Sequence, residues 1–349
     1  MRYRNLITAL FVLLALAAPA AASAAGKPGA VVFSKASTVG GVAKGGLFAV
    51  RDGHLNQLTE DPTDSEPAFS PDGRTIAFVR GGDIYSVRPD GSGQRRLSSG
   101  AGLDSAPVVS PSGRVVVFER RDTAGGQADL YTVGATGGGL RQLTSAAGDD
   151  HSARFSPDGK SIVFVRGFAG PEGGNDDLYT MRVNGSSQPR GLTRTAGVDE
   201  FAPRYFAGGI LFSRGESTPG PAAYADIYTM LVNGTKVKAQ VAGVGSAYVE
   251  DVSPDGHTLL FRRDQGLWAK QIGPGKARKL CQLPDNSVTN GVFSSDGRRV
   301  AAFVADEDRQ SLVAIDVASR RQTELAEGTD FTGHDGSTIG PVISWQPTR

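Results

Sequence analysis

Four acidic side chains recur at one position of a repeated sequence pattern, where they could bind a cation, an amine or a basic peptide segment. Each stands six residues before the serine, or its equivalent, of a recurrent turn. The four are Asp64, Asp104, Asp150 and Glu200, with Asp149, Asp199 and His151 beside them and His334 in the last long loop. Gathered carboxylates attract positive charge, so these eight residues form the predicted ligand-binding site. In the alternative interpretation, each carboxylate accepts hydrogen bonds from backbone amides where its own strand begins.

A second set of charged residues lies two positions before the same turn in three successive repeats. These residues are Arg154, Arg204 and Asp251. A pair of guanidinium groups suits the recognition of an anionic ligand. Ion pairs between neighbouring repeats are the alternative interpretation.

The histidines and the cysteine indicate no catalytic centre. The chain has four histidines, and no H-x-x-E-H, C-x-x-C, E-x-x-H or G-x-S-x-G spacing occurs. We therefore expect no cofactor, with a divalent cation near His151 and His334 as the alternative. Cys281 is the only cysteine and lies in a short apolar run, which predicts a buried, inert thiol and no disulfide.

The first 24 residues predict a secretory signal peptide. Arg2 and Arg4 precede an apolar stretch that ends in small residues, with Ala22-Ser23-Ala24 as a cleavage site. The stretch is too short for a stable membrane span, although a retained N-terminal anchor is the alternative. Its removal leaves basic and acidic residues almost equal in number, so we expect neither nucleic acid nor an anionic membrane as a partner.

The elements that must position these residues follow from a recurrent phenylalanine. It ends a short β-patterned run at Phe33, Phe78, Phe118, Phe164, Phe212, Phe261 and Phe303. The gaps are 40 to 49 residues, a period typical of β-propeller blades. Residues 25–349 are therefore predicted to form a single all-β domain, a seven-bladed β-propeller of four-stranded antiparallel blades.

Each repeat contains four strand-sized pieces, separated by Ser-Pro-Asp-Gly and Asn-Gly or Asp-Gly turns. The fourth piece, such as Gln57-Leu58-Thr59, is predicted to be a short polar edge strand. The first repeat lacks its opening piece, whereas Trp345-Gln346-Pro347, at the other end of the chain, matches Phe69-Ser70-Pro71. We therefore expect the C-terminal strand to close the ring, and we expect a monomer.

The repeat resembles the TolB-type, WD40-like propeller repeat. The matching features are the terminal Leu-Thr, the aromatic-Ser-Pro-Asp-Gly turn, the I-x-F run and an Asp-Ile-Tyr strand, as in Asp83-Ile84-Tyr85. The resemblance implies a β-propeller, extracytoplasmic in bacteria, which in TolB binds a peptidoglycan-associated lipoprotein. The chain departs from TolB because no α/β domain precedes its repeats. Related propellers occur in prolyl-oligopeptidase-like hydrolases and in oligogalacturonate lyases, whose site depends on a metal and histidines.

Two functions from different classes follow. The turns after the first and third strands are short, and we call the end of the ring that carries them the turn face. The loops after the second and fourth strands are long, and they form the loop face. Long loops on a rigid scaffold are common binding sites, so we expect a secreted or periplasmic, non-enzymatic propeller that binds a protein or cell-envelope ligand through the loop face. The alternative is a metal-assisted polysaccharide lyase or hydrolase.

Overall fold

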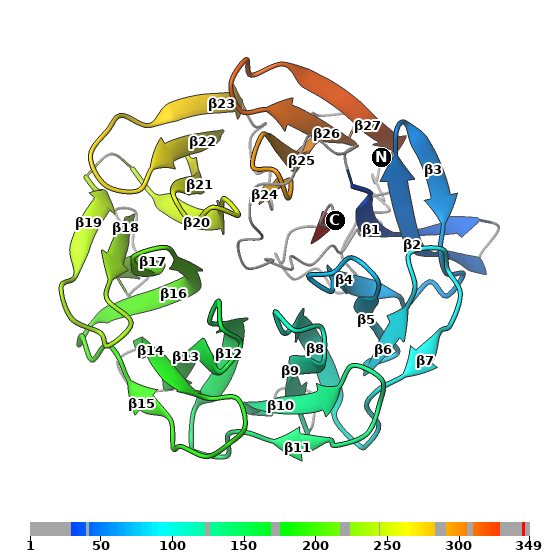
Figure 1. Cartoon of the computed structure of the whole chain (residues 1–349), viewed down its shortest axis with the longest axis horizontal. Helices are drawn as coiled ribbons and strands as arrows, with labels where there is room; N and C mark the ends of the chain where they lie inside the picture. The colour runs from blue at the N-terminus through cyan, green and yellow to red at the C-terminus, as the bar shows by residue number, and fades with distance from the viewer. Residues whose placement is uncertain are drawn as a thin grey trace, which may run out of the picture.

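Seven four-stranded antiparallel sheets stand side by side in a ring (Figure 1). The computed structural model describes residues 29–39, 42–122, 126–168, 175–216, 224–243, 245–282, 291–305, 310–328 and 344–345. Among these residues no helix is long and apolar enough to cross a membrane. The predicted signal peptide lies outside the described residues and stays a prediction. The seven-bladed propeller expected from the repeat is confirmed.

The four strands of each blade run from the ring interior to its rim (Figure 1). In blades 1 to 7 the innermost strands are β28 (Ser344–Trp345), β4 (Ser65–Phe69), β8 (Leu103–Val109), β12 (Asp149–Phe155), β16 (Val198–Phe206), β20 (Ala247–Val252) and β24 (Val292–Phe293). The second strands are β1 (Val31–Val39), β5 (Ile76–Arg80), β9 (Val115–Arg121), β13 (Ser161–Phe168), β17 (Gly209–Glu216), β21 (Thr258–Arg263) and β25 (Arg299–Ala305). The third strands are β2 (Val42–Arg51), β6 (Asp83–Val87), β10 (Ala128–Gly134), β14 (Asn175–Arg182), β18 (Ala225–Met230), β22 (Gly266–Gln271) and β26 (Gln310–Asp316). The outer strands are β3 (His54–Gln57), β7 (Arg95–Arg96), β11 (Arg141–Gln142), β15 (Arg190–Gly191), β19 (Lys238–Val241), β23 (Arg278–Gln282) and β27 (Gln322–Gly328).

The C-terminal strand closes the ring, as the sequence predicts. β28 pairs with β1 of the same blade, with Trp345 opposite Val31 and Ser344 opposite Val32. The Ser344 hydroxyl accepts a hydrogen bond from the backbone N–H of Phe69 in blade 2 at 3.0 Å. The first blade is therefore built from both ends of the chain.

The recurrent phenylalanines form the core between blades. Their exposed fractions lie between 0% and 4%. In six blades the phenylalanine stands opposite an aromatic residue of the third strand, for example Phe164 opposite Tyr179 with ring centroids 5.9 Å apart. Strands covered on both faces bury apolar side chains on both sides, which explains the runs without alternation in the sequence.

The Leu-Thr pair does not form the edge strand that the sequence predicts. In blade 2 only Arg95 and Arg96 pair with the third strand, and Leu97 and Ser98 then turn inward and are buried. The backbone N–H of Leu97 donates to the Ile84 carbonyl at 2.8 Å, and Ile84 N–H donates to the Ser98 hydroxyl at 2.8 Å. The buried Leu97 side chain and these two hydrogen bonds therefore anchor the end of the outer strand, because the buried polar groups find partners within the protein.

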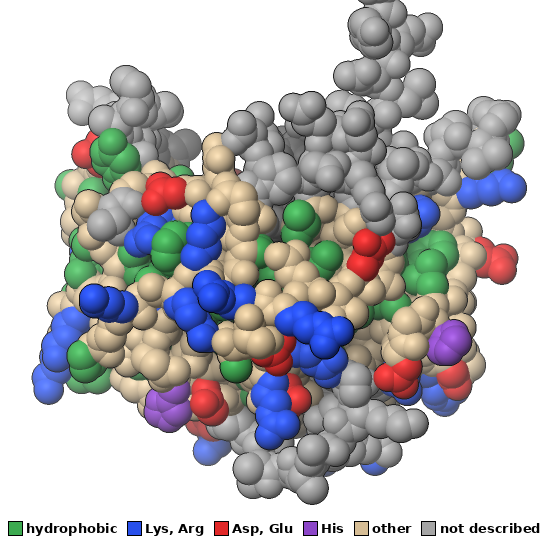
Figure 2. All heavy atoms as spheres, turned by 90° about the horizontal axis from the view of Figure 1, so that it is seen from above, with side chains coloured by type: hydrophobic (Ala, Val, Ile, Leu, Met, Phe, Trp, Pro, Cys, Tyr) green, Lys and Arg blue, Asp and Glu red, His purple; other side chains and the backbone are tan. Residues whose placement is uncertain are grey.

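Basic side chains occupy the outer strands of blades 2 to 6. These strands contain no acid and seven basic residues, namely Arg95, Arg96, Arg141, Arg190, Lys238, Arg278 and Lys279. Lys and Arg side chains are grouped on the side of the ring in Figure 2. Several reach the next blade: Arg141 donates to the Val183 carbonyl at 2.9 Å, and Arg190 donates to the Asn233 carbonyl at 3.3 Å. Part of this basic surface therefore fastens each blade to its neighbour.

Candidate functional site

The repeated carboxylates of the predicted site are buried and paired within their own blades. Asp64, Asp104, Asp150 and Glu200 are at most 3% exposed. Each lies against an arginine near the end of the second strand of the same blade. The Nε–oxygen distances are 2.6 Å for Arg80 and Asp64, 2.5 Å for Arg120 and Asp104, 2.6 Å for Arg166 and Asp150, and 2.8 Å for Arg214 and Glu200. The carboxylates therefore have positive partners inside the fold, and their predicted role in ligand binding stays a prediction.

The arginines are held by aromatic rings. The Arg166 guanidinium lies 5.7 Å from the Phe164 centroid and 4.9 Å from the Tyr179 centroid, and the other three blades repeat this arrangement. A cation over an aromatic face is attracted by the ring quadrupole. Sequence reasoning missed these arginines, although each stands two residues after the recurrent phenylalanine. That Phe-x-Arg spacing is the signal that would have found them.

A hydroxyl from the preceding blade completes three of these ion pairs. The Thr59 hydroxyl bonds Asp64, the Ser98 hydroxyl bonds Asp104, and the Thr193 hydroxyl bonds Glu200. Burial raises the pKa of Glu200, while the Thr193 hydroxyl and the Arg214 charge oppose that rise. Each of these carboxylates is therefore bonded to groups of two blades. The recurrent Leu-Thr or Leu-Ser pair contributes to the contact between neighbouring blades.

Asp149 and Asp199 bond backbone amides of the preceding blade, whereas the alternative interpretation placed such bonds at the start of each acid's own strand. The Asp149 carboxylate accepts a hydrogen bond from Ala128 N–H at 2.7 Å, and Asp199 accepts one from Asp176 N–H at 3.0 Å. Both amides lie at the start of a third strand in the preceding blade. The acids therefore cap strands of a neighbouring sheet.

His151 lies near one further carboxylate on the loop face. Its Nε2 is 4.0 Å from the Asp176 carboxylate, and its Nδ1 is 3.1 Å from the Ser152 hydroxyl. Burial raises the pKa of Asp176, and the nearby Asp199 and Asp149 charges add to that rise. Within the described ranges no three His, Cys, Asp or Glu residues are placed to hold a metal ion. His334 lies outside those ranges.

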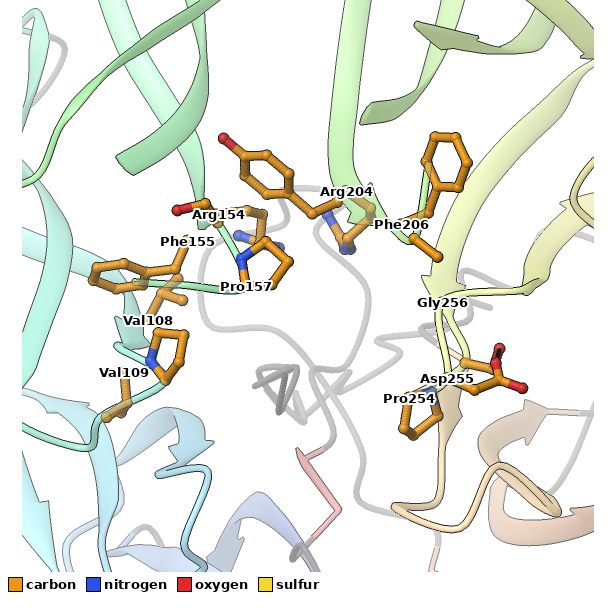
Figure 3. Close-up of a pocket in the computed structure, with 15 residues that line it drawn as sticks. Val108, Val109, Arg154, Phe155, Pro157, Arg204, Phe206, Pro254, Asp255 and Gly256 are labelled. Atoms are coloured by element: carbon orange, nitrogen blue, oxygen red, sulfur yellow. Dashed lines mark hydrogen bonds between the residues drawn. The ribbon is translucent and has the colours of Figure 1, made fainter. Parts of the chain in front are cut away.

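A cavity of about 100 Å³ opens at the turn face, where the innermost strands of blades 3 to 6 end (Figure 3). Its lining is mostly apolar and includes Val108, Phe155, Phe206, Pro157 and Pro254. Arg154 and Arg204 line it from neighbouring blades (Figure 3). Sequence reasoning assigned the turns at this end of the ring a structural role, and it offered the two arginines beside them as groups that could recognise an anionic ligand.

A backbone bulge places each of these two arginines. The pairing of β12 with β13 shifts between His151 and Arg154, and Ser152 adopts a φ of 56°. The pairing of β16 with β17 shifts between Phe201 and Arg204, and Ala202 adopts a φ of 50°. Bulges bend a strand and redirect the side chains that follow, so the two arginines reach the cavity from equivalent positions.

The two guanidinium groups are only partly bonded. Arg154 Nη1 donates to its neighbouring Ala153 carbonyl at 2.7 Å. Arg204 donates to the Pro203 carbonyl at 3.0 Å and to the Glu250 carbonyl at 3.2 Å. The Nε atoms of both arginines are buried without a hydrogen-bond partner. No ion pair joins either arginine to a carboxylate of the described residues, so the ion pairs expected at this register do not form there.

Burial and repulsion both act on the charge of this pair. Burial lowers the pKa of Arg154 to about 9, and the nearby Arg204 charge lowers it further, while Glu119 and Asp251 oppose the change. Burial also lowers the pKa of Arg204. Like charges in a low-dielectric site repel unless an opposite charge lies among them. An anion in the cavity would relieve this repulsion.

The buried acids around the pair each accept a backbone hydrogen bond, although Oδ1 of Asp251 has no hydrogen-bond partner. The Asp251 carboxylate accepts a hydrogen bond from Phe293 N–H at 2.9 Å, and Glu250 accepts one from Gly291 N–H at 3.1 Å. Burial raises the pKa of Asp251 to about 6 and that of Glu250 to about 8. At neutral pH Glu250 therefore offers little negative charge to Arg204.

The arrangement of blades has counterparts among solved structures. The ring resembles TolB. TolB from Acinetobacter baumannii superposes with a TM-score of 0.58 at 16% identity, over 92% of this chain and 83% of that one. No family model matches the sequence, and no curated protein matches it. The resemblance drawn from the repeats is thus confirmed at the level of the fold.

Propellers of enzymes match as well. An oligogalacturonate lyase in complex with manganese has a TM-score of 0.62 at 12% identity, over 90% of this chain and 99% of that one. A puromycin-hydrolyzing peptidase of Mycobacterium tuberculosis has a TM-score of 0.67 at 15% identity, over 92% of this chain and 54% of that one. Identities this low show the fold and not the activity.

Proposed function

We propose that this chain is a secreted or periplasmic, non-enzymatic propeller that binds a protein or cell-envelope ligand. The observation that supports it is the turn-face cavity, where two guanidinium groups with buried, unpaired Nε atoms meet an apolar lining. A binding site commonly combines an apolar hollow with a few polar groups that orient the ligand. The proposal moves the contact from the loop face, where the sequence placed it, to the turn face. A loop-face contact stays a prediction, because residues 123–125, 169–174, 217–223 and 329–343 lie outside the described residues.

The energetics of the arginine pair support a binding role. Burying two like charges costs stability unless hydrogen bonds and opposite charges compensate. Here part of the hydrogen-bonding capacity of both side chains is unused. A ligand anion would supply the missing compensation, so binding energy and folding energy are coupled at this site.

A capture experiment tests the proposal. The mature chain, residues 25–349, is immobilised and exposed to a cell-envelope extract, alongside the variants Arg204→Gln and Arg182→Gln. Arg182 is an exposed arginine of β14 that does not line the cavity, so it is the matched control. We expect wild type and Arg182→Gln to retain the same partner and Arg204→Gln to lose it. Failure of the wild type to retain any partner would refute the proposal.

The fold similarity to a manganese-bound lyase supports a second candidate function, that of a metal-assisted polysaccharide lyase or hydrolase. Its candidate ligands are His151, His334 and nearby carboxylates, and His151 does lie beside Asp176. The deciding measurement is the manganese content of protein purified without chelators, together with cleavage of oligogalacturonate. Stoichiometric metal and cleavage, both lost in His151→Asn, would replace the binding proposal.

A further inference from the structure

We propose that the turn-face cavity takes a carboxylate carried on an apolar group, the chemistry of a peptide C-terminus whose last side chain is apolar. Arg154 and Arg204 hold the carboxylate, and the surrounding apolar side chains contact the group that carries it. This inference rests on the proposed binding function and names the chemistry of the ligand. Only three of the blades carry a charged residue two positions before the turn, so the site is not a feature that every blade of the fold shares.

The donors for a carboxylate are in place. Arg204 is 8% exposed, and its Nη1 and Nη2 are fixed by two backbone carbonyls. Those bonds orient the guanidinium and leave its Nε free. Arg154 reaches the same cavity with its own free Nε. Guanidinium groups bond carboxylates through parallel N–H donors, and two held by the backbone need little ordering when the ligand binds.

Among the described residues that line the cavity, Arg154 and Arg204 are the only cations, and there is little negative charge to compete with a bound anion. Of its lining residues Asp255 is the only acid, and its carboxylate accepts hydrogen bonds from the Ser253 hydroxyl at 2.5 Å and from His257 N–H at 3.0 Å. Glu119 is also occupied, since it accepts a hydrogen bond from Ser152 N–H at 2.8 Å. Three buried polar atoms in this part of the described chain have no hydrogen-bond partner, namely Nε of Arg154, Nε of Arg204 and Oδ1 of Asp251. Asp251 does not line the cavity, so the unpaired atoms that belong to lining residues are both donors, which favours an anionic ligand.

The size and lining select the carrier of the anion. A cavity of about 100 Å³ holds an end group and not a whole saccharide or protein segment. Val108, Phe155 and Phe206 contribute to the lining from three neighbouring blades (Figure 3). The hydroxyls nearby, Ser156 and Ser253, already donate to their own turn aspartates. A sugar or phosphate ester would leave its hydroxyls unpaired against these apolar walls, whereas an apolar side chain gains from burial.

The test uses N-acetyl-phenylalanine, its uncharged amide and inorganic phosphate as probes of the full mature chain. Binding is read by calorimetric titration and by the rise in melting temperature with ligand concentration. We expect saturable binding of the acid and none of the amide. We expect Arg204→Gln and Arg154→Gln each to weaken binding about tenfold or more, as for loss of a charge-assisted hydrogen bond. The control Arg182→Gln should bind like wild type.

Each other outcome overturns the inference. Equal binding of acid and amide would show that the arginines play no part. Saturable binding of phosphate with none of the acid would assign the cavity to a different oxyanion. Absence of acid binding overturns the inference even if the variants fail to fold, because that comparison needs wild type alone. If wild type still captures an envelope partner while the acid does not bind, the inference fails and the proposed function stands.

Discussion

One arginine in each of blades 2 to 5 sits between an acid and two aromatic rings. In blade 4 the side chains of Arg166 and Asp150 are 7% and 0% exposed. Removing one partner of a buried ion pair leaves an uncompensated charge, which costs more than the intact pair contributes. Each of the four carboxylates therefore has a positive partner within its own blade.

Asp150→Asn tests this reading. Because Arg166 would stay buried opposite a neutral amide, we expect the free energy of unfolding to fall by about 3–5 kcal/mol, measured by urea denaturation. The double variant Asp150→Leu with Arg166→Met leaves no buried charge and should recover part of that loss. Equal or greater stability of Asp150→Asn alone would show that the carboxylate is repelled by its surroundings.

Glu250 gives the protein a pH dependence of its own. Burial raises its folded-state pKa to about 8, above the value in an unfolded chain. The folded state therefore holds a proton that the unfolded state has released, so this contribution to stability is lost as pH rises towards 8. We expect melting temperature to fall between pH 6 and about 8, and Glu250→Gln to reduce that slope. An unchanged slope in this variant would mean that Glu250 ionises alike in both states.

At the scale of the strand, the two-sided burial of the second strands decides stability. Phe164 of β13 is fully buried against Tyr179, whereas Phe168 at the end of the same strand is 39% exposed. The two positions therefore separate the effect of burial from that of residue type.

The matched pair Phe164→Ala and Phe168→Ala checks this assignment. We expect the first to lower the free energy of unfolding by about 3–5 kcal/mol, because it removes buried surface and leaves a cavity. We expect the second to cost far less, since Phe168 already contacts solvent. Similar costs in a denaturant titration would place the core elsewhere.

The outer strands show how neighbouring blades are joined. Each of the basic residues Arg95, Arg141 and Arg190 donates to a turn carbonyl one blade further on. The buried Leu-Thr or Leu-Ser pairs act at the other end of the same strands. The rim is therefore a series of contacts between blades rather than a row of free edges.

At the scale of the whole molecule, β28 holds the first and last blades together. Trp345 is 6% exposed, and its indole N–H donates to the Gly29 carbonyl at 3.0 Å. Ring closure covers the two apolar sheet faces that an open arc of blades would expose to solvent.

Removal of residues 344–349 tests closure. The deletion exposes the edge of β1 and the apolar side chains that Trp345 covers, so we expect a lower melting temperature and a tendency to aggregate. Circular dichroism and light scattering during heating report both effects. A melting curve identical to that of the full chain would show that β28 does not close the ring.

The ring was predictable because a propeller repeats one local pattern. The recurrent phenylalanines, the Ser-Pro-Asp-Gly turns and the unmatched C-terminal strand each point to the same blade, and local signals that agree specify a fold. The eight candidate residues were less informative. Acids at strand starts have the same sequence signature whether they bind a ligand or an internal arginine.

What the sequence by itself determined is the number of blades, the strands in each and the buried phenylalanines, since these depend on patterns within one repeat. Only the tertiary structure decided which charges meet. Arg154 and Arg204 lie 50 positions apart in the chain and face one cavity because the ring sets their blades side by side and a bulge redirects each side chain. Side-chain direction depends on the backbone angles at Ser152 and Ala202, residues whose types do not favour positive φ. The same bulge recurs in blades 2 and 3, at Glu66 and Ala106, so it belongs to the blade, but the residue types at this position do not reveal it.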